Sequence, residues 1–201
     1  MILAGDLLLG LGFGDPAPRR WRNERPRRSN ISDNSLSKGP PLPKHVRQGV
    51  TGSVWFEGES EIECDIGRVK RALDDLSELY VGVVSRMPGL TSVELVEQDS
   101  DSVTIRTNEG LMKRTNICKR IEAESVTVEF DEEYEAGSTV TTTSHFVDEF
   151  TASDASVMYR LVMSNVEASG FLGFFYRRLG SSKTGNAFLA AYKANFENRA
   201  E

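Results

Sequence analysis

Four side chains in the second half of the chain could perform acid–base chemistry in an enclosed site: His145, Asp148, Tyr159 and Arg178. An imidazole or a carboxylate in such a site can take up a proton, and a phenol or a guanidinium can stabilise a developing negative charge. Strand alternation places His145 on the side opposite Phe146, so we expect the imidazole to face solvent. Tyr159 best suits an apolar interior, where its hydroxyl needs a hydrogen-bond partner.

Metal and cofactor motifs are missing from the sequence. His45 and His145 lie far apart and form no His-x-x-x-His or Glu-x-x-His spacing, so no metal site is predicted. The segment 180–185 resembles a phosphate loop, but Arg177 and Ser182 stand where that loop requires glycine. The sequence therefore predicts no cofactor.

Two groups of charged residues could contact an ion or a ligand. The acidic group lies at an expected hairpin turn and consists of Asp131, Glu132, Glu133 and Glu135. We interpret it as a solvated turn in preference to a calcium site. The basic group lies within residues 103–121 and consists of Arg106, Lys113, Arg114, Lys119 and Arg120. Its members could pair with acidic residues on neighbouring strands or reach the anionic end of a ligand.

Charge and proline content divide the chain at about residue 50. Residues 1–50 hold six of the seven prolines and nine Lys or Arg against four Asp or Glu, whereas the remainder has a net charge of −11. We predict a disordered Pro/Arg-rich extension over 1–50 and a ligand-binding domain over 51–201. The acidic domain argues against nucleic-acid binding, and the basic extension allows weak contact with a membrane surface.

The cysteines and the first residues indicate the compartment. Cys64 and Cys118 are the two cysteines of the chain and are isolated in sequence, which suits a reducing cytoplasm. Residues 1–14 are apolar, but Asp6 interrupts them and no basic residue precedes them. They are too short to span a bilayer and lack the start of a secretory signal, so we predict a cytoplasmic protein.

Hydrophobic periodicity predicts the order of the folded elements. Residues 54–63 alternate between apolar and acidic side chains, as in a half-buried strand. Residues 65–80 carry apolar side chains at spacings of three and four, which predicts one amphipathic helix. Six strands without intervening helices are then expected, at residues 93–99, 103–107, 111–121, 126–130, 139–150 and 155–167.

The last segment, 171–196, is helical in pattern and rich in aromatic residues. As one continuous helix it places Phe171, Phe174 and Phe175 on the same side as Ser182 and Gly185. Small residues midway along a core-facing stripe would leave unfilled volume beside the sheet. The alternative is a break at 179–184 that divides the segment into two helices. The sequence leaves both possibilities open.

Short stretches of this chain resemble a known superfamily. They are Asp74-Asp75-Leu76 with Tyr80, Met87-Pro88-Gly89-Leu90, and the segment 92–97. They are similar to the START-like superfamily of polyketide cyclase/dehydrase and lipid-transport proteins, also called SRPBCC or Bet v 1-like. The resemblance implies an α+β helix-grip fold, in which a curved antiparallel sheet of six to seven strands encloses an apolar cavity against a long C-terminal helix. The family has two short helices where this pattern shows one.

These observations favour a non-enzymatic binding module, and no catalytic residue is assigned. We expect a hydrophobic small molecule or lipid between the sheet and the last helix. The predicted lining consists of Val128, Phe130, Phe146, Tyr159, Leu161, Phe171, Phe175 and Leu189. The alternatives are a polyketide cyclase/dehydratase-like enzyme on the same fold, or an accessory protein of a chaperone or membrane complex.

Overall fold

The computed structural model describes residues 53–136 and 140–198. Their helices and strands are β1 (Val54–Ile62), α2 (Ile66–Ala72), α3 (Leu76–Val84), β2 (Val93–Gln98), β3 (Val103–Thr107), β4 (Leu111–Ile121), β5 (Ser125–Ala136), β6 (Val140–Ser153), β7 (Ser156–Ala168), α4 (Gly170–Leu179) and α5 (Ser181–Glu197). The strands form one antiparallel sheet in the order β1-β7-β6-β5-β4-β3-β2. The predicted extension over residues 1–50 lies outside the described part.

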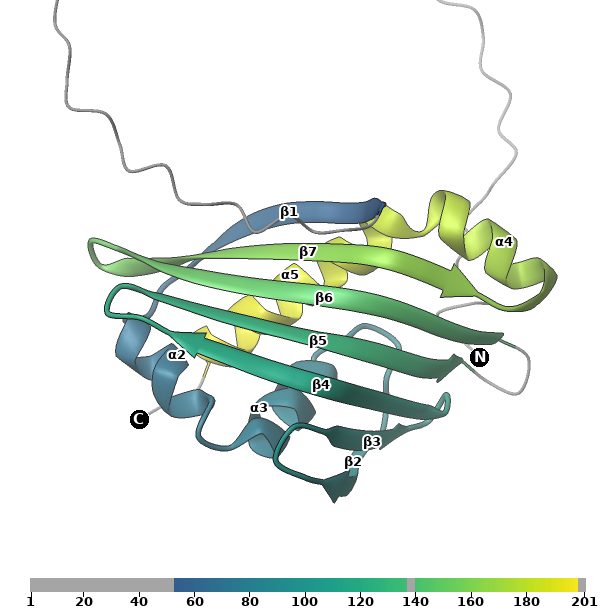
Figure 1. The fold of residues 1–201 in the computed structure, drawn as a ribbon, viewed down its shortest axis with the longest axis horizontal. Helices are drawn as coiled ribbons and strands as arrows, with labels where there is room; N and C mark the ends of the chain where they lie inside the picture. The colour runs from purple at the N-terminus through teal and green to yellow at the C-terminus, as the bar shows by residue number, and fades with distance from the viewer. Residues whose placement is uncertain (1–52, 137–139, 199–201) are drawn as a thin grey trace, which may run out of the picture. The chain divides into compact units, whose positions relative to one another are not determined.

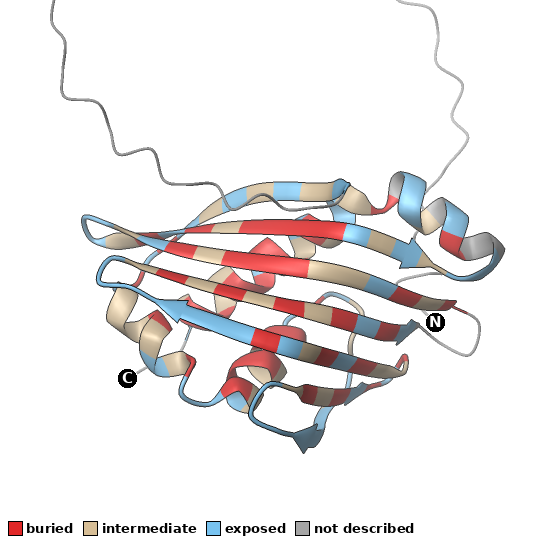
Figure 2. Cartoon of the chain, in the orientation of Figure 1, coloured by how far each residue is buried: buried red, intermediate tan, exposed pale blue. Residues whose placement is uncertain are grey.

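The sheet covers α5 from one side, as Figure 1 shows with α5 running behind β5, β6 and β7. α3 lies on the same side and packs against α5. Figure 2 shows buried residues alternating with exposed ones along the strands, as expected where one face of a sheet meets the core. This arrangement confirms the predicted α+β helix-grip fold. No described helix has both the length and the apolar character needed to cross a bilayer.

The amphipathic segment 65–80 forms two helices, so the prediction of one helix was wrong. α2 ends at Ala72, and α3 begins at Leu76 after its N-cap residue Asp75. The Asp75 carboxylate accepts hydrogen bonds from the Glu78 backbone N–H (2.9 Å) and the Ser77 hydroxyl (2.7 Å). An aspartate competes with helical backbone bonding inside a helix but stabilises a helix start. The apolar spacing continued across this turn and therefore did not reveal it.

The C-terminal segment is divided at Gly180 into α4 and α5, which decides the question that the sequence left open. Phe174 is half exposed and Ser182 is exposed, so neither belongs to the core-facing stripe of a single helix. Gly185 faces β1, where a Cβ atom would lie 2.2 Å from the ring of Phe56. The prediction of unfilled volume beside Gly185 was therefore wrong, because the ring of Phe56 occupies that position.

Candidate functional site

A buried ion pair lies between the sheet and the helices. Arg114 on β4 and Glu132 on β5 are paired in the register of the sheet, and the Arg114 Nε–H donates to Glu132 Oε2 at 2.9 Å. Met112 and Arg114 are two residues apart and share the inward side of β4, so the guanidinium enters the core and its residue has no exposed surface. Glu132 lies within β5, which corrects our assignment of the acidic group to a solvated turn.

Aromatic rings enclose the guanidinium of Arg114. Its Cζ lies 4.3 Å from the ring centroid of Tyr80, 4.8 Å from that of Phe130 and 6.0 Å from that of Phe188. The faces of aromatic rings attract cations, and this attraction offsets part of the cost of burying the charge. We call these five residues, from α3, β4, β5 and α5, the arginine cluster: Tyr80, Arg114, Phe130, Glu132 and Phe188.

Three hydrogen-bond donors in the arginine cluster have no partner among the described residues. They are Arg114 Nη1, Arg114 Nη2 and the Tyr80 hydroxyl, and all are buried. The hydroxyl belongs to the ring over which the guanidinium lies, so the donors share one region. A buried polar group without a partner costs about 1–3 kcal/mol, and more when it is charged. Such donors indicate a place where an acceptor oxygen would be strongly stabilised.

A second buried polar group lies against α5 and centres on Asp148 of β6. Its carboxylate accepts hydrogen bonds from the Tyr159 hydroxyl (2.8 Å) and the Tyr192 hydroxyl (2.7 Å). The rings of Phe150 and Tyr159 stack at 4.7 Å, and Phe196 meets Phe150 edge-on at 5.8 Å. Burial raises the pKa of Asp148 to about 6, against the lowering effect of the two tyrosines and Arg114. We call these five residues the aspartate cluster.

Glu132 provides the counter-charge that keeps Arg114 protonated. Burial alone would lower the pKa of Arg114, but the Glu132 carboxylate raises it above its usual value. Burial raises the pKa of Glu132, against the charge and the hydrogen bond of Arg114. A neutral Glu132 would leave a buried cation without a counter-charge, so we treat the pair as ionised at neutral pH.

The structure buries every predicted lining residue whose side chain it describes: Val128, Phe130, Phe146, Tyr159, Leu161 and Leu189. Phe130 stacks on Phe146 at 4.9 Å beside Arg114, and Tyr159 belongs to the aspartate cluster. Phe171 and Phe175 are part of α4, and their side chains lie outside the described part. Contact of these residues with a ligand stays a prediction.

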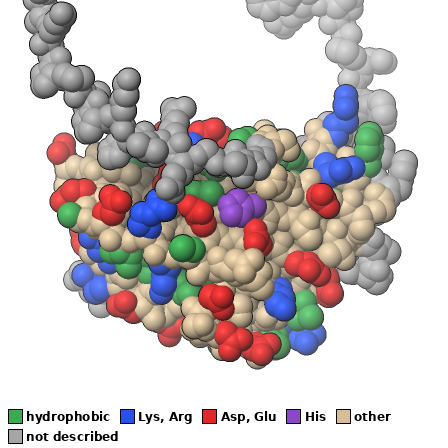
Figure 3. Space-filling view, viewed as in Figure 1, with side chains coloured by type: hydrophobic (Ala, Val, Ile, Leu, Met, Phe, Trp, Pro, Cys, Tyr) green, Lys and Arg blue, Asp and Glu red, His purple; other side chains and the backbone are tan. Residues whose placement is uncertain are grey.

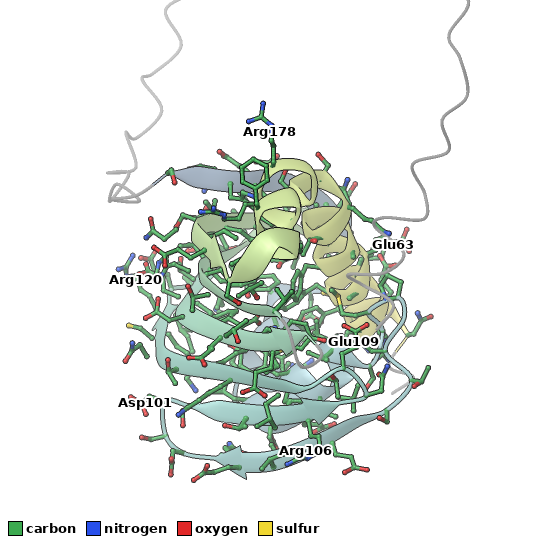
Figure 4. The ribbon with its side chains drawn as sticks, turned by 90° about the vertical axis from the view of Figure 1, so that its right-hand side faces the viewer. Glu63, Asp101, Arg106, Glu109, Arg120 and Arg178 are labelled. Atoms are coloured by element: carbon green, nitrogen blue, oxygen red, sulfur yellow. The ribbon has the colours of Figure 1, made fainter. Side chains whose placement is uncertain are left out.

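The other predicted chemical groups lie at the surface. His145 Nδ1 and Asp131 Oδ1 are joined by a 2.9 Å hydrogen bond on the outer face of the sheet, where the imidazole is half-buried. Figure 3 shows a histidine side chain at the surface of this face. Arg106, Arg120 and Arg178 lie at the periphery in Figure 4, with Arg178 pointing away from the body. In the described part no three His, Cys, Asp or Glu side chains are placed to hold a metal ion.

Sequence reasoning named Arg114 and Asp148 among several candidates but did not single them out. Asp148 shares its strand parity with Phe146 and Phe150, which was a usable signal for an inward carboxylate. Arg114 shares parity with Met112, but Lys113 and Thr115 gave the opposite face a comparable polar pattern. Only the pairing of β4 with β5 in the sheet showed which face of β4 points into the core.

Comparisons with known proteins bear on the fold. No protein-family model and no curated protein sequence matches the chain. A conserved protein from Geobacillus kaustophilus has a TM-score of 0.50 at 14% identity, and the match covers 70% of this chain and 90% of that one. Hypothetical protein jhp0584 from Helicobacter pylori has a TM-score of 0.50 at 14% identity, with 81% and 98% covered. A STAR-related lipid transfer protein from Xanthomonas axonopodis has a TM-score of 0.45 at 12% identity, with 70% and 84% covered.

At such low identity these matches bear on the fold alone and leave the ligand undetermined. The element order of this chain is a strand, two short helices, six antiparallel strands and C-terminal helices. The resemblance found in the sequence implied that order, including the second short helix. The chain therefore has the α+β helix-grip fold, a curved antiparallel sheet with helices on one of its faces.

Proposed function

We propose that the protein binds a hydrophobic small molecule or lipid between the sheet and α5, with the polar end of the ligand at the arginine cluster. The observation that carries this proposal is the set of three buried donors on Arg114 and Tyr80 that have no hydrogen-bond partner in the part of the chain that the structure describes. They lie among apolar and aromatic side chains, which suits a ligand that is apolar except at one end.

Two free-energy terms would stabilise such a complex. An acceptor oxygen of the ligand would remove the cost of the unpaired donors, which is about 1–3 kcal/mol for each neutral group. Burial of apolar ligand surface would add roughly 25 cal/mol per Å². The first term selects a ligand with a polar end, and the second term provides most of the affinity.

Titration with the neutral dye N-phenyl-1-naphthylamine tests the proposal, followed by displacement with fatty acids, quinones and polyketide-like aromatics. We expect saturable binding and displacement by at least one of these classes. Phe188→Trp adds bulk beside Arg114 and should weaken binding about tenfold, a change of about 1.4 kcal/mol. Ala190→Trp adds the same side chain on the exposed side of the same helical turn and should change nothing.

Two results would contradict the proposal in protein that circular dichroism shows to be folded. The first is the absence of saturable binding for every ligand class. The second is an equal effect of Phe188→Trp and Ala190→Trp, because binding would then take place outside the interior.

One observation favours catalysis as a second candidate function. Asp148 is a buried carboxylate with a pKa of about 6 and a direct hydrogen bond to Tyr159, so it could exchange a proton near neutral pH. If the protein turns over a polyketide-like substrate, Asp148→Asn and Tyr159→Phe should each lower kcat while N-phenyl-1-naphthylamine still binds. Unchanged turnover in both variants would eliminate this candidate.

A further inference from the structure

We infer that the oxygen presented to Arg114 belongs to a neutral acceptor group of the ligand, such as a ketone, ester or amide carbonyl, and not to a free carboxylate. This inference rests on the proposed function and names the chemical class of its ligand. It follows from the donors that are left unpaired and from the charges that surround them.

The unpaired groups of the arginine cluster, among the described residues, can all donate a hydrogen bond. Arg114 uses its Nε–H on Glu132, which leaves the N–H groups of Nη1 and Nη2, and Tyr80 adds a hydroxyl. Burial raises the pKa of Tyr80 well above its usual value, so this phenol stays protonated and can donate. A carbonyl oxygen has two lone pairs and can accept two such hydrogen bonds without bringing a charge.

The charge of Arg114 is already neutralised by Glu132. A ligand carboxylate on the remaining nitrogens would place two carboxylates beside one guanidinium in a region that excludes water. Two carboxylates that contact the same guanidinium repel each other strongly in a medium of low dielectric constant. Either Glu132 or the ligand carboxylate would then have to take up a proton. A neutral carbonyl meets no such penalty.

Asp148 makes the surroundings more negative still. The ionisable groups that face this region are Arg114 on β4, Glu132 on β5, Asp148 on β6, and the tyrosines Tyr80 on α3, Tyr159 on β7 and Tyr192 on α5. Burial and the Asp148 carboxylate raise the pKa of Tyr159 and of Tyr192, so the tyrosines are neutral. Above the Asp148 pKa of about 6, the formal charge of the group is therefore −1.

A matched pair of fluorescent probes tests the inference. The ketone 6-propionyl-2-(dimethylamino)naphthalene and the carboxylate 6-(dimethylamino)-2-naphthoate share one ring system and differ in the acceptor group. At pH 8 we expect the ketone to bind at least about tenfold more tightly than the carboxylate, since only the carboxylate adds charge. Below pH 6 the carboxylate should gain affinity, because Asp148 becomes neutral, whereas the affinity of the ketone should stay constant.

Glu132→Gln provides the sharper test. It removes the counter-charge of Arg114 and leaves the guanidinium in place, so the preference for the ketone at pH 8 should shrink by about tenfold or reverse. Glu133→Gln changes the neighbouring residue, whose side chain is exposed on the other face of β5, and should leave the preference unchanged. If Glu132→Gln does not fold, the double variant Arg114→Met with Glu132→Met removes both charges. The fluorescence emission of the bound ketone should then shift to the blue, because its oxygen no longer accepts hydrogen bonds from the guanidinium.

The outcomes separate the inference from the proposed function. Equal or tighter binding of the carboxylate at pH 8, weakened by Phe188→Trp, would overturn the inference and support interior binding. An unchanged preference in Glu132→Gln would also overturn it. If neither probe binds, the proposed function fails and the inference falls with it.

Discussion

At the scale of single residues, the buried pair of Arg114 and Glu132 is the feature with the largest energetic consequence. Removing two charges from water is costly, and their mutual attraction recovers the cost only when geometry and additional hydrogen bonds are favourable. Here one hydrogen bond joins the pair and two guanidinium nitrogens stay unpaired. We therefore expect the pair to contribute little to stability as a whole, although each member depends on the other.

Substitution of one member of this pair should destabilise the protein far more than substitution of both. Arg114→Met leaves the Glu132 carboxylate buried and unpaired and should cost roughly 3–5 kcal/mol, whereas Arg114→Met with Glu132→Met should be close to neutral. Urea unfolding measures both. Lys113 and Glu133 are the neighbouring cross-strand pair, and both side chains are exposed on the outer face of the sheet. The variant with methionine at both of these positions is the control. Similar losses for the single and double interior variants would contradict this expectation.

Asp148 should make the folded state less stable as the pH rises through the acidic range. The unfolded chain loses this proton near pH 3.8 and the folded chain near pH 6, so the folded state holds a proton in that window that the unfolded state has released. Relative to Asp148→Asn, the wild type should lose up to roughly 3 kcal/mol between pH 4 and pH 7 and change little above pH 7. Chemical denaturation at several pH values provides the comparison, and a constant difference would argue against the raised pKa.

At the scale of the elements, short helices with defined starts hold Tyr80 and Phe188 against the sheet. α3 presents Tyr80 to Arg114, and its first residue follows the capping carboxylate of Asp75. α5 presents Phe188 and Tyr192 on neighbouring sides, and Gly185 brings its first turns close to β1. The start of α3 therefore determines where the Tyr80 hydroxyl lies, and the close approach of α5 to β1 determines where the Phe188 ring lies.

The cap of α3 should be measurable by a neighbouring pair of substitutions. Asp75→Ala removes the acceptor for the Glu78 N–H and should lower the free energy of unfolding by about 1 kcal/mol. Asp74→Ala changes the preceding exposed aspartate, which does not occupy the capping position, and should have a much smaller effect. Thermal unfolding of both variants distinguishes them, and equal shifts in Tm would show that the cap has no special role.

Gly185 should not tolerate even a methyl group. In Gly185→Ala the new Cβ would lie 2.2 Å from the Phe56 ring, and we expect a steric cost of about 1–3 kcal/mol. That cost exceeds the gain of roughly 1 kcal/mol that alanine brings to a helix. Asn186→Ala on the exposed side of α5 should be neutral or stabilising. Adding Phe56→Leu to Gly185→Ala should restore part of the loss in urea unfolding, and a stabilised Gly185→Ala would refute the close packing.

At the scale of the whole molecule, the seven described strands form one sheet, and one core joins residues of α2, α3 and α5 to that sheet. β1 is the first strand of the described residues and pairs with β7, so it joins the two ends of the described domain. Pairing between strands so far apart in sequence makes the domain depend on the complete range from β1 to α5. We propose residues 51–201 as the unit that folds.

Removal of residues 1–50 tests this boundary. The shortened chain should unfold in one transition at a Tm close to that of the full chain, because β1 and its partners are all retained. The removed segment carries a net charge of +5, so association with vesicles of anionic lipid should fall in the shortened chain. Loss of folding would place the boundary earlier, and unchanged vesicle association would exclude the basic segment as the contact.

The sequence by itself determined the type and order of nearly all elements, because alternation along a strand and three-to-four spacing along a helix are local patterns. It also placed Phe130 and Phe146 on the apolar sides of their strands, and both residues are buried. Only the tertiary structure decided that Arg114 lies inside. Both faces of β4 carry charge, and the partner Glu132 is reached through the register of two strands and not through spacing along one. The rings of Tyr80 and Phe188 complete the site from α3 and α5, so its donors are brought together by packing between distant segments.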